Sequence, residues 1–240
     1  MQNVKAVKQT MLVSFSGIDG SGKSTQIAEL CTELVKGGRS IELRTFWNDI
    51  ASFKGLREFA GYKLFGGDVG VGTPQAPIRR RDKDVQTGFM TFVRLAVYLV
   101  DAISMRLATR KALNSEADVV IFDRCIYDQL VNLNMKSRFV RFYVQSILKL
   151  VPSPHVALFL DADPIAALAR KPEYSLEFLR VNRDAYLAFA RIAPGVTVIP
   201  PLTAEQVRTT VAKCIAAQFA GRTVQLGHAQ PAAAGKDVLL

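Results

Sequence analysis

The sequence predicts an α/β fold in which a parallel sheet of about five strands lies between two layers of helices. Three observations predict it. Five short apolar runs alternate with longer helical patterns, and this alternation is typical of parallel strands joined by helical crossovers. The apolar runs lack strict in-and-out alternation, as strands that are covered on both faces do. The chain has 240 residues, 49% of them hydrophobic, which is enough to bury one large core.

The predicted strands are the five short runs, at residues 11–16, 40–46, 119–122, 155–160 and 196–199. The segments between them are helical in pattern, at residues 22–35, 53–64, 88–113, 127–150, 173–192 and 204–219. Gly37 and Gly38 end the first of these helices. A further helix begins where Asp163 can act as the cap and Pro164 takes the first helical position.

These elements predict one domain, at residues 1–220. Within it we expect an insertion at residues 49–86 and a short helical lid at about residues 168–180. Residues 221–240 form a tail rich in Ala and Gly, a composition that favours disorder.

The charge of the chain favours anionic partners. Its 31 Lys and Arg residues exceed its 21 Asp and Glu residues, for a formal charge of +10, which suits nucleotides or nucleic acid. Cys31, Cys125 and Cys214 lie far apart, so neither a disulfide framework nor a zinc site is indicated. The first ten residues lack the apolar core of a signal peptide, and the longest apolar run is too short to span a bilayer. We therefore expect a cytoplasmic protein without a membrane partner.

A phosphate-binding motif lies between the first predicted strand and the first helix. Residues 17–24 read GIDGSGKS and match G-x-x-x-x-G-K-[ST] completely. The glycines let backbone N–H groups turn toward phosphate oxygens, and the following helix presents the positive end of its dipole. Lys23 brings a charge to the terminal phosphates, and the Ser24 hydroxyl is a magnesium ligand. The alternative is an ordinary glycine-rich turn before a helix.

The motif predicts a P-loop kinase fold with ATP as the donor. The expected ATP-binding residues are Gly17, Asp19, Gly20, Ser21, Gly22, Lys23, Ser24 and Thr25.

An acid and an arginine follow the third predicted strand. Asp123 stands where an acid can hold magnesium, directly or through water. Motor ATPases usually have Glu at the next position to activate water, whereas this chain has Arg124. The pair therefore favours clamping of phosphates over hydrolysis. The alternatives are a helix cap for Asp123 and a surface ion pair for Arg124.

Three segments together resemble the thymidylate kinase family of nucleoside monophosphate kinases. They are FSGIDGSGKST at residues 15–25, VVIFDR at 119–124 and LDADPIAALAR at 160–170. The resemblance implies phosphoryl transfer from ATP to dTMP with magnesium, usually by a homodimer. It also implies that Asp19 approaches the acceptor and the magnesium ion, that Arg124 clamps the phosphates, and that Arg94 lies beside the acceptor base with Phe92 as a stacking neighbour.

The lid is the expected source of a further arginine. One variant of the family carries an arginine inside the phosphate loop and another brings it from the lid, and Gly20 makes this chain resemble the second. The lid candidates are Arg170, which is nearest the lid tip, Arg180 and Arg183.

The acceptor side departs from the family pattern, while the ATP side matches it. The acid-proline-glycine-glycine-threonine segment expected after the second strand is replaced by RTFWNDIASFKG at residues 44–55. Cys125 stands where the family usually has tyrosine. The glutamine that recognises thymine is replaced, and Asn132 and Asn134 are the nearest amides.

Several acceptor-side residues have two interpretations. Arg94, Tyr98 and Asp101 lie at i, i+4 and i+7 and so share one face of a helix. This face either forms a wall toward the acceptor or holds an ion pair within the core. Phe46 and Trp47 either stack on an acceptor base or pack in the core. The three consecutive arginines at residues 79–81 either form a solvated loop face or bind nucleic acid or an acidic acceptor.

The sequence thus predicts Mg·ATP-dependent phosphoryl transfer to a nucleoside monophosphate, with dTMP as the best single acceptor. Alternatives are a kinase of another nucleotide or of a small hydroxyl or phosphate acceptor, a nucleic-acid-associated ATPase, and a protein that binds ATP without transfer. Nucleic acid is not the expected partner. The expected catalytic residues are Lys23, Asp19, Arg124 and Arg170. The expected acceptor-binding residues are Phe92, Arg94, Tyr98, Arg124 and Arg183, and the expected magnesium ligands are Ser24 and Asp123.

Overall fold

The computed structural model describes residues 10–51 and 88–228. The strands in this part of the chain form one five-stranded sheet in the order β2-β3-β1-β4-β5. All four neighbouring pairs are parallel, which confirms the predicted sheet. The strands are β1 (Met11–Ser16), β2 (Ile41–Thr45), β3 (Val119–Asp123), β4 (Val156–Leu160) and β5 (Val196–Ile199).

The helices in the same residues lie between the strands along the chain, except that α9 follows β5. They are α1 (Lys23–Lys36), the π-helix η1 (Phe46–Ile50), α4 (Gly88–Leu113), α5 (Tyr127–Leu130), α6 (Arg138–Leu150), α7 (Pro164–Arg170), α8 (Leu176–Ala190) and α9 (Ala204–His228). None of them combines the length and apolar character that crossing a membrane requires.

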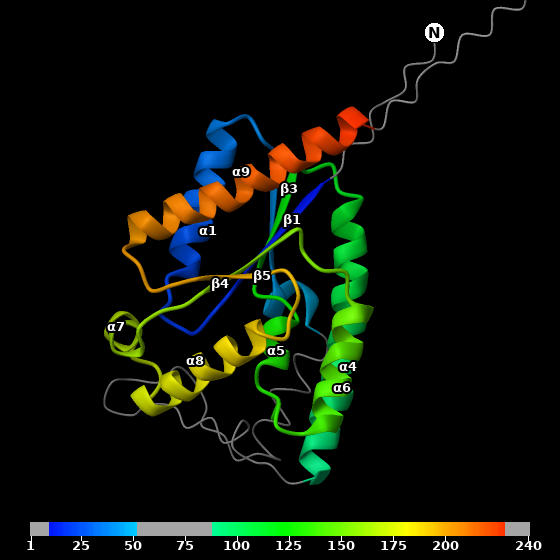
Figure 1. Ribbon diagram of the computed structural model, residues 1–240, viewed down its shortest axis with the longest axis vertical. Coiled ribbons are helices and arrows are strands. Elements are labelled where there is room, and N and C mark those ends of the chain that lie inside the picture. The colour runs from blue at the N-terminus through cyan, green and yellow to red at the C-terminus, as the bar shows by residue number, and fades with distance from the viewer. Residues whose placement is uncertain (1–9, 52–87, 229–240) are drawn as a thin grey trace, which may run out of the picture.

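The sheet separates two hydrophobic clusters, which makes the fold three-layered. Residues Met11, Val13 and Phe15 of β1 pack in the cluster with α1 and α9. Leu12 of the same strand belongs to the other cluster, with residues of α4, α5, α6 and α8. This alternation follows from the period of two along a strand. Figure 1 shows α1 and α9 together on one side of the strands, and α4 and α6 together on the other.

Side chains cap the starts of helices α7 and α6. Asp163 caps α7 as predicted, because its carboxylate accepts a hydrogen bond from the Ala166 backbone N–H at 2.9 Å. The segment predicted to be helical over residues 127–150 contains two helices, since α5 ends at Leu130 and α6 starts at Arg138. The hydroxyl of Ser137 accepts from the Val140 N–H and so restarts the helix.

The predicted insertion begins in a π-helix, and the predicted tail begins within α9. Residues 46–50 form a π-helix, and the Asp49 carboxylate accepts a hydrogen bond from the Thr45 N–H at 2.5 Å. The helix expected at residues 53–64 and the arginines at 79–81 lie outside the described residues. Helix α9 runs to His228, past residue 221, where the tail is predicted to begin. A single interior glycine costs a helix only about 1 kcal/mol, and the neighbours of Gly221 continue the helix.

Candidate active site

The phosphate loop follows β1 at the carboxyl end of the sheet and turns through three glycines. Gly17, Gly20 and Gly22 have φ angles of 144°, 79° and 89°, a region that residues with a Cβ rarely adopt. At Gly17 a Cβ would also lie 2.6 Å from the carbonyl oxygen of Leu160. Gly22 precedes the first residue of α1, so the loop ends at a helix N-terminus, which is the arrangement that binds phosphate.

Gly20 brings the loop against helix α7, whose last residues belong to the predicted lid. A Cβ at this position would collide with the backbone carbonyl of Ala167. An arginine would not fit there without moving α7. This contact supports the expectation that the additional cation of the site comes from the lid.

Lys23 lies inside the loop and is held by its backbone. Its ammonium donates hydrogen bonds to the carbonyl oxygens of Gly17 at 2.9 Å and Ile18 at 2.8 Å, and to the Ser21 hydroxyl at 3.4 Å. Burial, and secondarily the nearby Arg124 charge, lowers the pKa of Lys23 to about 8. An anion bound in the loop would relieve this destabilised charge.

Oxygen ligands suited to magnesium lie beside the loop. Ser24 and Thr25 are exposed on the first turn of α1. Asp123, at the end of β3, is opposite Phe15 in the sheet and half-buried. The described residues contain no cluster of three or more acidic, His or Cys side chains that could hold a metal. Magnesium bound with nucleotide needs only one or two protein oxygens, because phosphates and waters supply the rest, so a Ser24 hydroxyl and an Asp123 carboxylate fit it.

Arg124 lies at the junction of the loop and a cavity, held by two carboxylates. Its Nη2 is 2.5 Å from Asp19 Oδ1, and its Nη1 is 3.1 Å from Asp128 Oδ1. Burial opposes its charge, but the carboxylates of Asp128 and Asp19 outweigh burial and raise its pKa. Its φ of 68° is positive, a strained conformation that turns the chain sharply after β3. The Arg124 N–H donates to the Phe15 carbonyl at 2.9 Å, which fixes this turn.

Asp128 is a central residue of the site that the sequence analysis did not single out. Its side chain is 2% exposed. Besides Arg124, it accepts hydrogen bonds from the hydroxyls of Ser16 at 2.7 Å and Tyr186 at 2.5 Å, and from the Cys125 N–H at 3.1 Å. The i,i+4 spacing of Arg124 and Asp128 was the signal that could have revealed the pair.

A cavity of about 520 Å³ opens beside Arg124, between α4, α5 and the lid. Its lining combines charged, amide and aromatic side chains: Asp19, Trp47, Arg94, Tyr98, Arg124, Asp128, Gln129, Asn132, Lys171, Glu173, Tyr174, Phe178, Asn182 and Tyr186. The volume lies within the usual range for a small-molecule site. Arg94 and Tyr98 line the cavity, which agrees with the interpretation of this helix face as a wall toward the acceptor.

The two adjacent aromatics of η1 take one role each. Phe46 is fully buried in the core, whereas Trp47 lines the cavity and is 38% exposed. Their rings meet edge-on, with centroids 5.3 Å apart. Asn132 lines the cavity, whereas Asn134 is not among the lining residues.

Two further residues of α4 lie away from the cavity. Phe92 is 70% exposed and does not line the cavity, because two residues along a helix correspond to a rotation of about 200° from Arg94. Asp101 is fully buried, with the Gln129 amide 3.5 Å away, and belongs to the core rather than to the wall.

The predicted lid arginines lie in three different environments. Arg170 lines a second cavity of about 320 Å³, which also contains Gly22 and Thr25 of the phosphate-loop side. Arg183 lines neither cavity, because both Nε and Nη2 bond to the Asp161 carboxylate, at 2.6 and 2.7 Å. Arg180 is exposed on α8.

Lys171 was not among the lid candidates. It follows α7, lines the 520 Å³ cavity and pairs with Glu173 at 3.2 Å.

Sequence comparison finds relatives that match most of the length of the chain. The probable thymidylate kinase of Pyrobaculum calidifontis is 26% identical over 196 residues, which cover 79% of this chain and 86% of that protein. The probable thymidylate kinase of Methanosphaera stadtmanae is 23% identical over 201 residues, or 82% and 92% of the two chains. The chain is a divergent relative of the thymidylate kinases. No family model matches it.

Solved structures of thymidylate kinases share the fold. The enzyme from Candida albicans has a TM-score of 0.57 and 18% identity, with 88% of this chain and 93% of that chain covered. The enzyme from Ehrlichia chaffeensis has a TM-score of 0.51 and 18% identity, with 86% and 98% covered. These thymidylate kinase relatives confirm the predicted P-loop kinase fold.

Proposed function

We propose that the chain transfers the γ-phosphoryl group of ATP to a nucleoside monophosphate, with dTMP as the first acceptor to test. One observation carries the proposal: Asp19 belongs to the phosphate loop, pairs with Arg124 and lines the 520 Å³ cavity. A donor held by the loop and an acceptor in the cavity would therefore meet at this ion pair. The relatives in the thymidylate kinase family support dTMP as the acceptor.

The donor is held by the phosphate loop. Backbone N–H groups of residues 17–25 and the Lys23 ammonium bind the polyphosphate, which takes over the hydrogen bonds that Lys23 makes to Gly17 and Ile18. Arg170 borders the smaller cavity that adjoins the loop, so it contacts the donor nucleotide rather than the acceptor. Ser24 and Asp123 would hold magnesium, which neutralises charge on the phosphates when it is bound.

The transfer itself depends on positioned positive charge. The transition state spreads negative charge over the oxygens of the moving phosphoryl group, and cations aimed at it stabilise that charge. Arg124 supplies this charge from β3, and Lys171 supplies it from the lid, since both line the acceptor cavity. The acceptor phosphate is already anionic, so its attack requires no strong general base. Closure of the lid excludes water, which would otherwise attack ATP.

The acceptor base has aromatic and amide partners in the cavity. Trp47 and Phe178 present rings for stacking, and Gln129 and Asn132 present amides to the edge of a base. Arg94 and Tyr98 line the same space from α4.

A second candidate is a kinase of a hydroxyl acceptor, such as a nucleoside. The observation that favours it is that the cavity lining includes the carboxylates of Asp19 and Glu173. A hydroxyl must lose its proton during transfer, and a nearby carboxylate can accept it.

We also propose that the chain forms a homodimer through α4. Phe92, Leu99, Ile103 and Leu107 are exposed along one side of this helix, and Ala96 between them is exposed as well. The stripe carries no charge, so two copies related by a twofold axis can meet there without repulsion. Light scattering should give the mass of two chains, and Ile103→Glu should yield a folded monomer; a monomeric parent chain would contradict the dimer.

An acceptor panel tests the proposed activity. The purified chain is incubated with Mg·ATP and each nucleoside monophosphate or its matching nucleoside, and both ADP and the phosphorylated product are identified. We expect dTMP to yield ADP and dTDP in equal amounts, and the Lys23→Ala variant to yield neither. Turnover of nucleosides alone would establish the second candidate instead. ADP formation that no acceptor stimulates would refute both.

A further inference from the structure

Asp128 is buried at the centre of a hydrogen-bond network that the proposed chemistry does not yet use. Its Oδ2 accepts from Ser16 Oγ and the Cys125 N–H, and its Oδ1 accepts from Tyr186 and Arg124. A buried carboxylate is stable as an anion only when such partners satisfy it. Four donors fix the orientation of this carboxylate.

The arginine beside it needs an external partner to hold its position. Arg124 has a long side chain with many rotamers, whose ordering costs free energy. Its backbone is in a strained conformation with φ of 68°. Asp19 and Asp128 bind different nitrogens of the guanidinium, so the planar group is held at two points. Asp128 is the more buried of the two carboxylates, with 2% of its side chain exposed against 22% for Asp19.

Tyr186 in turn holds Asp128 from helix α8. Its ring stacks on Phe159 of β4 with centroids 4.9 Å apart and planes 7° from parallel. Burial, and then the adjacent Asp128 charge, raises the pKa of Tyr186 well above its ordinary value. The hydroxyl therefore keeps its proton and donates a hydrogen bond to Asp128 at 2.5 Å. Tyr186 joins the sheet, α8 and the carboxylate in one rigid unit.

We propose that Asp128 is a positioning residue, held by Tyr186 and Ser16, that fixes the guanidinium of Arg124 where the phosphate loop meets the acceptor cavity. The inference rests on the proposed function for the part that Arg124 plays in transfer. Helix α8 begins just after the lid residues 171–175, so Tyr186 makes the orientation of Arg124 depend on the helix that carries the lid.

Two variants test this role in the full chain. Asp128→Asn removes the charge but keeps the side-chain shape, and Tyr186→Phe removes one hydroxyl while leaving a ring to stack on Phe159. We expect kcat to fall at least about tenfold in the first and about threefold in the second, with the dissociation constant of ATP changed less than about twofold. If either folded variant has the parent kcat and acceptor KM, or loses ATP affinity by the same factor as kcat, the positioning role is overturned.

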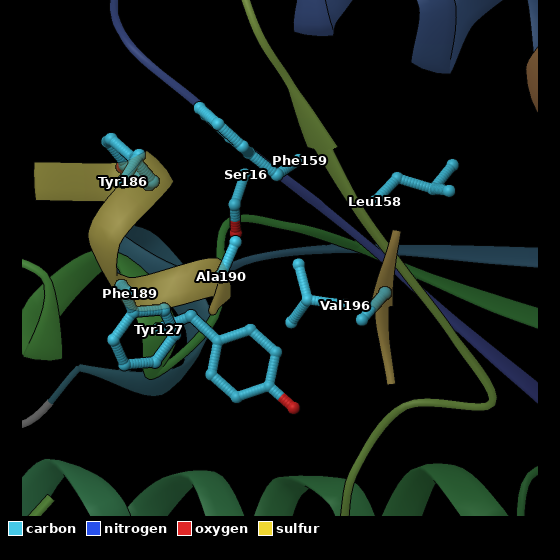
Figure 2. A pocket seen from close by; sticks show the side chains of 9 residues that line it. Ser16, Tyr127, Leu158, Phe159, Tyr186, Phe189, Ala190 and Val196 are labelled. Atoms are coloured by element: carbon cyan, nitrogen blue, oxygen red, sulfur yellow. The ribbon is translucent and has the colours of Figure 1, made fainter. Parts of the chain in front are cut away.

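Tyr127→Phe is the matched control for a buried tyrosine hydroxyl. Tyr127 is as buried as Tyr186 and packs against Phe189. Figure 2 shows both tyrosines around a small cavity, with the Tyr127 hydroxyl pointing away from Ser16 and Tyr186. The Tyr127→Phe variant should keep the parent kcat, because the hydroxyl that it loses is not one of the four donors to Asp128. An equal loss in Tyr127→Phe and Tyr186→Phe would indicate general core damage and would overturn the proposal.

A double variant separates positioning from structural support. If Asp128 acts through Arg124, adding Asp128→Asn to Arg124→Ala should lower kcat no further than about twofold. A full additional loss would overturn the proposal, because Asp128 would then act independently of Arg124.

A crystal structure of Tyr186→Phe gives a test that does not depend on turnover. The proposal predicts that the Arg124 guanidinium leaves its position between Asp19 and Asp128. An unchanged Arg124 would overturn the positioning role even if the parent phosphorylates its acceptor. Conversely, a displaced Arg124 in a protein without any acceptor turnover would support the positioning and refute only the proposed function.

Discussion

The Arg124 guanidinium lies 2.5 Å from the carboxylate of Asp19, so an ion pair links the end of β3 to the phosphate loop. The two residues are 105 positions apart in the sequence. Both belong to turns that follow neighbouring parallel strands, whose carboxyl ends meet at one edge of the sheet. The Asp19–Arg124 ion pair therefore joins the phosphate loop to the 520 Å³ cavity.

Replacing Arg124 by lysine should impair transfer far more than donor binding. Lysine keeps the charge but has a single nitrogen, which cannot bond Asp19 and Asp128 from two points as the guanidinium does. We expect kcat to fall about 30-fold, which corresponds to about 2 kcal/mol of transition-state stabilisation. Steady-state kinetics with ATP varied at saturating acceptor measure it. A variant with parent kcat would show that Arg124 is not at the reacting centre.

ATP binding should weaken as the pH rises through about 8. The pKa of Lys23 is lowered to about 8, mainly by burial, so the side chain is a cation below that pH and neutral above it. Phosphate favours the cation, and kcat/KM for ATP reports on the free protein. This parameter should be level near pH 7 and fall about tenfold per pH unit well above 8. A profile that stays level to about pH 9.5 would contradict the role of the Lys23 charge.

Gly20→Ala should disrupt the contact between the loop and the lid helix. The new Cβ would collide with the Ala167 carbonyl, in addition to the strain of a φ of 79°. Strain of this kind costs about 1–2 kcal/mol, and displacement of α7 should raise the KM for ATP at least about fivefold. Thermal unfolding and steady-state kinetics measure the two effects.

Gly38→Ala provides the control for this substitution. Gly38 has a similar φ of 71°, but nothing lies within 4 Å of the position that a Cβ would take there. The change should lower the melting temperature without changing the KM. If both alanine variants shift the KM equally, the proposed contact of Gly20 with α7 does not govern ATP binding.

Two consecutive lid cations should affect different substrates. Arg170 lines the smaller cavity beside the phosphate loop, and Lys171 lines the acceptor cavity. Arg170→Ala should raise the KM for ATP about five- to tenfold, and Lys171→Ala should raise the KM for the acceptor and lower kcat by a similar factor. Arg191→Ala, which replaces an exposed arginine after α8, should change neither. Equal effects of the two lid variants on one substrate would contradict the division.

The sheet and the phosphate loop could be predicted because their signals are local. Each strand is a short run that is apolar enough to identify, and its observed bounds lie within one residue of the prediction. The phosphate motif occupies eight consecutive residues, and its glycines have the positive φ angles that the motif requires. Local signals of this kind do not depend on partners elsewhere in the chain.

The network around Asp128 could be predicted only as far as its pair with Arg124, because Ser16 and Tyr186 are distant from it in sequence. Tyr186 and Asp128 are 58 residues apart, and each lies in a helix whose pattern alone suits an ordinary amphipathic segment. The role of Asp128 becomes visible only when α5, α8 and β1 meet at the end of the sheet.

The lining of the acceptor cavity could be predicted only in part, for a geometric reason. Arg94 and Phe92 are close in sequence, but α4 directs them to different sides, and only Arg94 lines the cavity. Phe46 and Trp47 each had two open interpretations, and the π-helix separates them into one core residue and one cavity residue. A single π-turn has no sequence signature that would have revealed this.

The most direct measurement is a crystal structure of the chain with magnesium, a non-hydrolysable ATP analogue and dTMP. Our account predicts the analogue's triphosphate wrapped by residues 17–25 against Lys23, and the phosphate of dTMP beside Arg124 in the larger cavity. Triphosphate bound at any other place, with the glycine turn and Lys23 untouched, would contradict it.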